Sequence, residues 1–269
     1  MDYHKNNIFE LTKKQIYFFD LDGTVYLGNK LFEGVPELIE ILRKNKRHFF
    51  FLSNNSSIST DDYLKKLNSF NLNITPDNLI LSQHPTIDYL KRENFKKLFL
   101  LGSTSLKREF EKEGFELDEE NPEIVVLAFD KELTYERLAK ATKFLLSNDF
   151  PYIATHLDNR CPTENGYIPD AGGIAALLYK TTDRMPKVFG KPNREMLLFK
   201  LKQLSIAPKE AIIFGDRLYT DIKMGKNAGV LTCCVLSGET TLEMIKENDV
   251  KPDFILNGIW ELLNEFKKI

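Results

Sequence analysis

Two aspartates, Asp20 and Asp22, stand one residue apart at the end of the apolar run Ile16–Phe19 and are followed by Gly23. Aspartate is uncommon in β-strands, and an unpaired buried carboxylate is energetically costly. The pair therefore indicates a point where water and a cation reach the chain, or where the acids themselves react. Because both side chains lie on one face of an extended chain, Asp20 can act as a nucleophile and Asp22 can transfer protons beside it. Gly23 then allows a sharp turn out of the strand.

Polar residues also follow three later segments of the chain. Ser53 and Asn54 end an apolar run in "FLSNN", Lys191 lies in "FGKPN", and Asp216 and Asp221 lie in "IFGDRLYTD". In an open α/β sheet, ligands bind beyond the carboxyl ends of the strands, where segments far apart in the sequence meet. We therefore expect these residues to share one site with the two N-terminal aspartates.

The four signals together suit phosphoryl transfer. Asp20 and Asp216 offer oxygen ligands to Mg²⁺, which commonly takes one or two carboxylates besides phosphate and water. The metal, the Lys191 ammonium and the Ser53 hydroxyl would hold the phosphoryl group, and such charge neutralisation and positioning dominate this chemistry. Attack by Asp20 would give an acyl-phosphate, while Asp22 would protonate the leaving alcohol and later activate water.

Alternating strand and helix patterns surround these signals. After the strand Ile16–Phe19, a helix is expected from about Pro36 to Lys46, followed by a strand at His48–Leu52 and a helix in "STDDYLKKLNSF". Two further strands, "AIIFGD" and "VLTCCVL", each precede a helical pattern. This repetition predicts an α/β fold with a doubly wound, Rossmann-like parallel sheet. In the middle of the chain, the segments "KLFLLG", "EIVVLAF" and "PYIAT" are predicted to be further strands with helices between them. Residues 159–173 are rich in Pro, Gly and Asn and are predicted to form a loop.

Composition narrows the classes of function and location. The chain of 269 residues carries 37 Lys and Arg against 39 Asp and Glu, a formal net charge of -2, which argues against general nucleic-acid binding. No apolar run approaches the ~20 residues that cross a membrane, and the N-terminal residues lack the apolar core of a signal peptide. The three cysteines have no metal-site spacing and are expected to be reduced thiols. We therefore expect a cytoplasmic protein without a membrane or nucleic-acid partner.

The motifs resemble a known family. In their order along the chain, "DLDGTVYLG", "FLSNNSS", "GKPN" and "GDRLYTDIKMGKNAG" resemble the haloacid dehalogenase (HAD) superfamily of phosphohydrolases. Within it, the chain is similar to the NagD-like, p-nitrophenyl phosphatase group, whose substrate loop is matched by "ATHLDNRCPTENGYIPDAGGI". The likeness spans the chain from about Ile16 to the C-terminus.

The resemblance implies a role for each matching residue. Asp20 would be the nucleophile and Asp22 the general acid and base. Ser53, Asn54 and Lys191 would bind the phosphoryl group or the substrate. The side chains of Asp20 and Asp216 and the carbonyl of Asp22 would hold Mg²⁺, with Asp221 in support.

The resemblance also implies a domain plan. Residues 1–82 and 186–269 would form the HAD catalytic core, and residues 83–185 would form an inserted α/β cap. Asp158 and the loop Asn165–Gly173 would face the site from the cap and influence the choice of substrate. His156 and Tyr219 depart from the residues common in relatives, which bears on specificity. Because cap surfaces in relatives often self-associate, a homodimer is also expected.

The predicted function is therefore a Mg²⁺-dependent phosphatase. It would hydrolyse small phosphorylated metabolites, such as sugar or nucleotide phosphates and p-nitrophenyl phosphate in vitro, through an aspartyl-phosphate. Two alternatives stay open. A phosphomutase would pass the phosphoryl group to a sugar instead of water, and a receiver-like signalling module would accept phosphate without turnover. A dehalogenase fits poorly, because that chemistry needs neither a metal nor a leaving-group acid.

Overall fold

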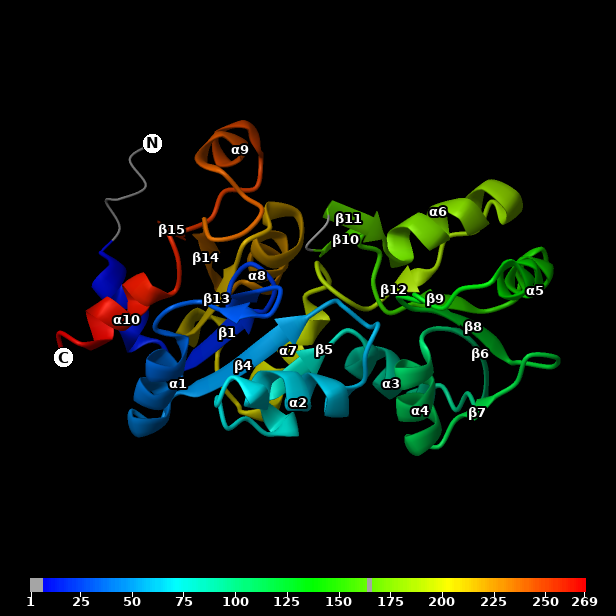
Figure 1. Cartoon of the computed structure of the whole chain (residues 1–269), viewed down its shortest axis with the longest axis horizontal. Helices are drawn as coiled ribbons and strands as arrows, with labels where there is room; N and C mark the ends of the chain where they lie inside the picture. Colours follow the sequence, from blue (N-terminus) through cyan, green and yellow to red (C-terminus); the bar gives the residue numbers. More distant parts are fainter. Residues whose placement is uncertain (1–6, 164–165) are drawn as a thin grey trace. The chain divides into compact units, whose positions relative to one another are not determined.

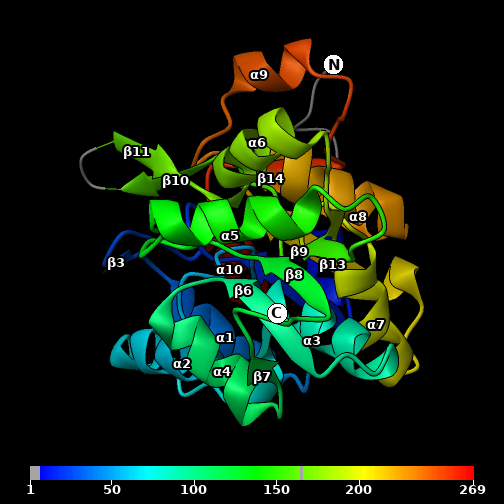
Figure 2. The same cartoon turned by 90° about the vertical axis from the view of Figure 1, so that its right-hand side faces the viewer.

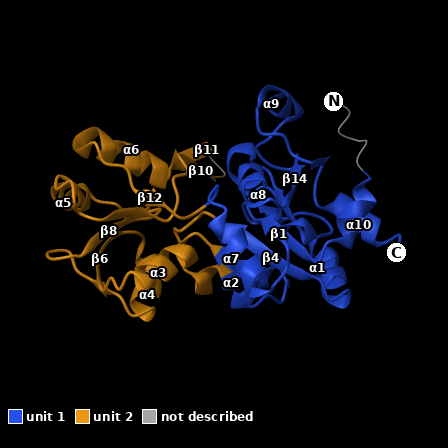
Figure 3. Cartoon of the chain, turned by 180° about the vertical axis from the view of Figure 1, so that it is seen from behind, with its two compact units in different colours: residues 1–53, 64–80, 191–269 blue, residues 54–63, 81–190 orange. Residues whose placement is uncertain are grey.

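The structure is a computed structural model that describes residues 7–163 and 166–269. It divides into two compact units (Figure 3). Unit 1 comprises residues up to 53, residues 64–80 and residues 191–269, and unit 2 comprises residues 54–63 and 81–190. Unit 2 is therefore inserted into the sequence of unit 1. The observed division differs from the predicted one chiefly at residues 54–63, which belong to unit 2.

Unit 1 is built on a six-stranded sheet with the order β15-β14-β13-β1-β4-β5 (Figure 1). In chain order, the strands are β1 (Ile16–Asp20), β4 (His48–Ser53), β5 (Leu79–Leu81), β13 (Ala211–Gly215), β14 (Leu231–Val235) and β15 (Phe254–Leu256). β1 runs parallel to its neighbours β4 and β13, and β14 runs parallel to β13 and β15. Because the sheet grows outward on both sides of β1, the predicted doubly wound parallel sheet is confirmed.

Helices flank this sheet. They are η2 (Ile8–Lys13), α1 (Val35–Lys44), α2 (Thr60–Ser69, of which residues 64–69 lie in unit 1), η3 (Pro76–Asn78), α7 (Glu195–Gln203), η4 (Pro208–Glu210), η5 (Leu218–Ile222), α8 (Lys223–Ala228), α9 (Leu242–Glu247) and α10 (Trp260–Phe266). The short strands β2 (Tyr26–Leu27) and β3 (Lys30–Leu31) form an antiparallel ribbon after β1. Across the described ranges, no helix is both long and apolar enough to span a membrane.

Strand β1 is covered on both faces. Phe18 belongs to a buried cluster that includes side chains of α7 and α8, whereas the Tyr17 ring contacts Phe266 of α10. All five residues of β1 are buried, because a parallel strand with helices on both faces has no solvent side. Asp20 is the first carboxylate along this strand and stands at its carboxyl end.

Unit 2 is a second α/β layer structure with the strand order β12-β9-β8-β6-β7, all parallel. Its strands are β6 (Lys97–Leu101), β7 (Glu116–Leu117), β8 (Ile124–Leu127), β9 (Tyr152–Ala154) and β12 (Lys187–Val188). Its helices are α3 (Gln83–Arg92), α4 (Thr104–Lys112), α5 (Tyr135–Leu145) and α6 (Ala171–Thr182). Helices α3 and α4 cover one face of the sheet and α5 and α6 cover the other (Figure 2).

Residues 54–63 belong to unit 2 because hydrogen bonds tie them to its helix α4. The Ser103 hydroxyl donates to the Ser57 carbonyl at 2.7 Å, and the Thr60 backbone N–H donates to Glu109 Oε2 at 2.9 Å. These partners are about 46 to 49 residues apart in the sequence. Hydrogen bonds between residues so far apart leave no local pattern in the sequence. The predicted boundary at residue 83 therefore does not include residues 54–63.

The predicted loop at residues 159–173 is wrong in part. Strands β10 (Arg160–Thr163) and β11 (Gly166–Pro169) form an antiparallel hairpin, and α6 begins at Ala171. Pro and Gly suggest a loop, but a two-stranded ribbon has two open edges and tolerates residues that a central strand excludes. Asn165, expected to face the substrate, lies outside the described residues.

Candidate active site

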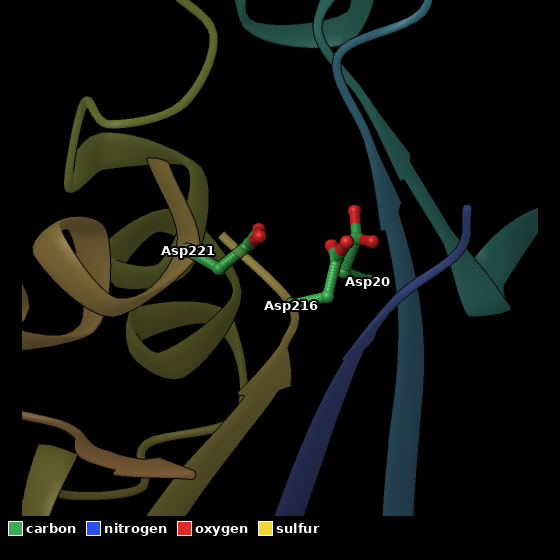
Figure 4. Close-up of side chains that lie close together, drawn as sticks. All are labelled: Asp20, Asp216 and Asp221. Carbon is green, nitrogen blue, oxygen red and sulfur yellow. The ribbon is translucent and has the colours of Figure 1, made fainter. Parts of the chain in front are cut away.

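Three carboxylates meet at the carboxyl ends of the central strands of unit 1 (Figure 4). Asp20 is the last residue of β1, Asp216 directly follows β13, and Asp221 lies in the π-helix η5. All three are buried, and one oxygen of each lies within 4.8 Å of the others. Because β1 and β13 are adjacent and parallel, their ends must deliver Asp20 and Asp216 to the same edge.

Lys191 joins this group. Its buried ammonium donates hydrogen bonds to Asp20 Oδ1 and, at 2.7 Å, to Asp221 Oδ1. Burial lowers the pKa of Lys191, but the charges of the two aspartates more than offset this and raise it, so the side chain carries its charge. With all three carboxylates ionised, the group carries a formal charge of −2, which a divalent cation would balance.

The two carboxylate oxygens of Asp216 differ in their hydrogen bonding. Its Oδ2 accepts a hydrogen bond from the Glu239 backbone N–H at 2.7 Å, whereas its buried Oδ1 has no hydrogen-bond partner among the described residues. Burial and then the charge of Asp221 raise the pKa of Asp216 to about 7. A buried carboxylate oxygen without a donor is costly, and a cation is the ligand that would satisfy it.

The pKa of Asp20 also supports a cation at this site. Burial raises the pKa of Asp20 well above its usual range, Lys191 opposes this, and Asp221 and Asp216 add to it. A bound divalent ion reverses this balance, because it stabilises the ionised form of every carboxylate around it. All the oxygen donors of the group are hard ligands, so the residues present fit Mg²⁺.

Asp22 lies on the turn that follows β1. Its Oδ2 accepts a hydrogen bond from the Tyr26 hydroxyl at 3.2 Å, and the chain turns through Gly23, whose φ is +86° and whose N–H donates to the Tyr26 carbonyl at 2.8 Å. Burial raises the pKa of Asp22, and the charge of Lys66 partly opposes this. A raised pKa suits a residue that must carry a proton to a leaving group.

Ser53 and Asn54 follow one another at the end of β4. Asp20 pairs with Leu52 in the sheet, so Ser53, which is buried, stands one position beyond the nucleophile candidate on the adjacent strand. Asn54 belongs to unit 2, where its Nδ2 donates to Asp158 Oδ1 at 2.9 Å. Their roles in binding phosphate or substrate stay predictions.

The loop after β14 contributes residues that the sequence analysis missed. A Cβ atom on Gly238 would lie 2.0 Å from Asp216 Oδ2, so only glycine fits there, and the Ser237 hydroxyl donates to the Gly23 carbonyl at 2.7 Å. Glu239, besides its backbone bond to Asp216, accepts from the Tyr219 hydroxyl at 3.2 Å. The polar "SGET" directly after the apolar "CCVL" was the available signal, because it marks another strand end beside β13.

The comparison with known proteins agrees with this arrangement. Residues 17–116 match the haloacid dehalogenase-like hydrolases, and residues 188–262 match a family described as HAD-hydrolase-like. The chain belongs to the haloacid dehalogenase-like hydrolase family, as its motifs predict.

Individual relatives narrow this class. The crystal structure of 4-nitrophenylphosphatase from Thermotoga maritima is 40% identical to this chain, with a TM-score of 0.90 over 96% of this chain and 99% of that one. NagD from Escherichia coli K-12 is 26% identical, with a TM-score of 0.84 over 93% and 98% of the two chains. The acid sugar phosphatase of Staphylococcus haemolyticus is 30% identical over 94% of this chain and 96% of its own length. The predicted NagD-like group and the predicted enzyme class, a HAD-type phosphatase, are confirmed.

Proposed function

We propose that this chain is a Mg²⁺-dependent phosphatase that hydrolyses small phosphorylated metabolites through an aspartyl-phosphate on Asp20. The observation that carries the proposal is the meeting of Asp20, Asp216 and Lys191 at the carboxyl ends of the sheet. The relatives named 4-nitrophenylphosphatase and acid sugar phosphatase support a small phosphate ester as the substrate.

The first half-reaction forms the intermediate. The Asp20 carboxylate attacks phosphorus, the phosphorus–oxygen bond to the leaving group breaks, and Asp22 gives its proton to the departing oxygen. In the second half-reaction, Asp22 takes a proton from water, which attacks the phosphorus of the acyl-phosphate. Phosphate leaves, and the Asp20 carboxylate is restored.

Other side chains hold the group that moves. Lys191 and the Ser53 hydroxyl would bind the phosphoryl oxygens that do not transfer, and Lys191 keeps Asp20 oriented by its hydrogen bond. Mg²⁺, held by Asp20, Asp216 and the carbonyl of Asp22, would offset the negative charge of the phosphoryl group and of the carboxylates. Asp221 supports this arrangement by orienting Lys191.

We also propose that unit 2 is the cap that selects substrates. It is inserted between Ser53 and Lys191 in the sequence, and the four catalytic signals all stand outside its parallel sheet. Its hairpin carries Tyr167, which is 56% exposed and whose ring centroid lies 4.2 Å from the guanidinium carbon of Arg160. An exposed aromatic and basic pair of this kind suits contact with a polar organic group.

Asp22→Asn is expected to slow the phosphorylation step more for a sugar phosphate than for p-nitrophenyl phosphate. An alkoxide needs a proton as it leaves, whereas p-nitrophenolate is stable without one, and general acids contribute roughly 10²–10⁴-fold. Rapid-mixing burst kinetics separate this step from hydrolysis of the intermediate, in which Asp22 also acts. Equal slowing for the two substrates would count against the general-acid role.

The proposed activity is tested by phosphate release from a panel of phosphorylated metabolites with Mg²⁺ present. We expect many moles of phosphate per mole of chain. Release limited to one mole would favour the receiver-like module. Formation of an isomeric sugar phosphate without net release would favour the phosphomutase.

A further inference from the structure

A buried histidine lies in unit 2 outside the proposed catalytic residues. His156 follows β9, is fully buried, and accepts a hydrogen bond at Nδ1 from the Asp158 backbone N–H at 3.3 Å. Its Nε2 lies 3.6 Å from Asp170 Oδ1 and has no hydrogen-bond partner within residues 7–163 and 166–269. A neutral ring that accepts at Nδ1 carries its proton on Nε2, so the ring presents a donor toward Asp170 and an acceptor toward Asp158.

Asp158, whose backbone His156 holds, also binds the residue that follows Ser53. Its Oδ1 accepts the 2.9 Å hydrogen bond from Asn54 Nδ2, and the Asn54 carbonyl accepts a second bond from the Ser82 hydroxyl at 2.7 Å. Asn54 is therefore held in unit 2 at both its side chain and its backbone. The residue before it in the chain is Ser53, which the proposed function assigns to phosphate binding.

The segment before Lys191 is held beside the same residues. The Gly190 N–H donates to the Thr155 carbonyl at 2.6 Å. A Cβ atom on Gly190 would lie 2.6 Å from Asn54 Oδ1 and 2.9 Å from His156 Cβ, so these residues are in close contact. Asn54 directly follows Ser53, and Gly190 directly precedes Lys191. These two neighbours of the phosphate-binding candidates thus pack together against the segment that carries His156.

We infer that His156 is a positioning residue for phosphate binding. By holding the Asp158 backbone, it keeps the Asp158 carboxylate on Asn54 and so fixes the direction in which the chain leaves Ser53. Gly190 packs against Asn54 and His156, so the same contacts also fix where the chain enters Lys191. This inference rests on the proposed function of Ser53 and Lys191 and extends it to a residue that touches neither the substrate nor the metal.

Two substitutions separate the two ends of the ring. In His156→Asn, the side-chain oxygen stands at the position of Nδ1 and can still accept from the Asp158 N–H. In His156→Gln, the polar group reaches the position of Nε2, but the acceptor near Asp158 is lost. If Asp158 is the partner that matters, the Asn variant keeps the function and the Gln variant loses it.

The measurement is competitive inhibition by inorganic phosphate, together with kcat/KM for acetyl phosphate and for a sugar phosphate. We expect His156→Gln to weaken phosphate inhibition and to lower both kcat/KM values about five-fold, the effect of one lost hydrogen bond. His156→Asn should stay within about two-fold of the wild type, and so should His48→Asn, a control at an exposed histidine of unit 1. A Gln variant with unchanged phosphate inhibition, or with a loss confined to the sugar phosphate, would overturn the inference.

A double-variant comparison tests the route through Asp158. Asp158→Ala removes the acceptor for Asn54, so adding His156→Gln to it should cost no further phosphate affinity. Additive losses would mean that His156 acts by another route and would overturn the inference. Thermal melts of each variant identify losses due to unfolding. If the Gln variant does not fold, Asp158→Ala, at a half-buried site, should by itself weaken phosphate inhibition to a similar extent, and unchanged inhibition in it would overturn the inference. Absence of phosphatase activity in the wild type would instead contradict the proposed function.

Discussion

Asp20→Asn is expected to lower turnover at least ~10³-fold while leaving the metal-free protein as stable as the wild type or more so. The substitution removes the nucleophile and one metal ligand together. It also removes a charge that burial and two neighbouring carboxylates make unfavourable, since the pKa of Asp20 is raised well above its usual range. Lys191 keeps its 2.7 Å hydrogen bond to Asp221. Activity and stability are therefore expected to move in different directions.

The measurement combines steady-state phosphate release with thermal unfolding in EDTA. Asp77→Asn is the matched control, because Asp77 is an exposed aspartate in the same unit. It should leave both quantities unchanged. If purified Asp20→Asn protein keeps more than a tenth of the wild-type turnover, the assignment of the nucleophile is wrong. A large fall in its melting temperature would mean that the carboxylate is needed for the fold.

Removal of the metal is expected to abolish activity reversibly. EDTA should silence the enzyme and added Mg²⁺ should restore it, because the candidate ligands are carboxylate and carbonyl oxygens, which suit a hard cation. Asp216 Oδ1, which has no hydrogen-bond partner within residues 7–163 and 166–269, supports this requirement. Full turnover in excess EDTA would remove the metal from the mechanism.

The same site predicts how Mg²⁺ binding depends on pH. The pKa of Asp216 is raised from 3.8 to about 7, so the metal-free folded protein binds this proton more tightly than the unfolded chain does. The stability that this proton contributes is complete below about pH 4 and is lost as pH rises through about 7. Mg²⁺ competes for the same oxygens and binds best where the proton has left.

Mg²⁺ should therefore raise the melting temperature at least ~3 °C more at pH 8 than at pH 5.5, which corresponds to a free energy of about one pKa unit. Differential scanning fluorimetry with and without Mg²⁺ at the two pH values measures this difference. Asp216→Asn is the control variant and should lose both the stabilisation by Mg²⁺ and its pH dependence. An equal rise at both pH values in the wild type would contradict the role of Asp216 as a metal ligand.

Much of the fold and of the core site was predictable because the signals are local. An unbroken apolar run that ends in acids, as at Asp20, specifies a buried strand with its reactive end at the carboxyl edge. Ser53 at the end of β4 and Asp216 directly after β13 follow the same pattern of an apolar run that ends in polar residues. Since parallel strands of a doubly wound sheet end on the same side, Asp20, Ser53 and Asp216 all lie at the carboxyl edge of the sheet, and the Asp20 and Asp216 carboxylates meet there. The family resemblance supported the same prediction, and it rested on four motifs in order and not on any single residue.

What the local pattern left open was decided by contacts between distant residues. The hydrogen bonds from Lys191 to Asp20 and Asp221 join residues 171 and 30 positions apart. The close approach of Gly238 to Asp216 depends on the placement of β14 beside β13. The bond from Asn54 to Asp158 spans 104 residues, and with the helix α4 contacts of residues 54–63 it sets where unit 2 begins. Apolar periodicity specifies which residues are buried in each strand and helix, but a polar side chain takes its partner from the loops that the tertiary fold brings beside it, so these pairings exist only in the folded chain.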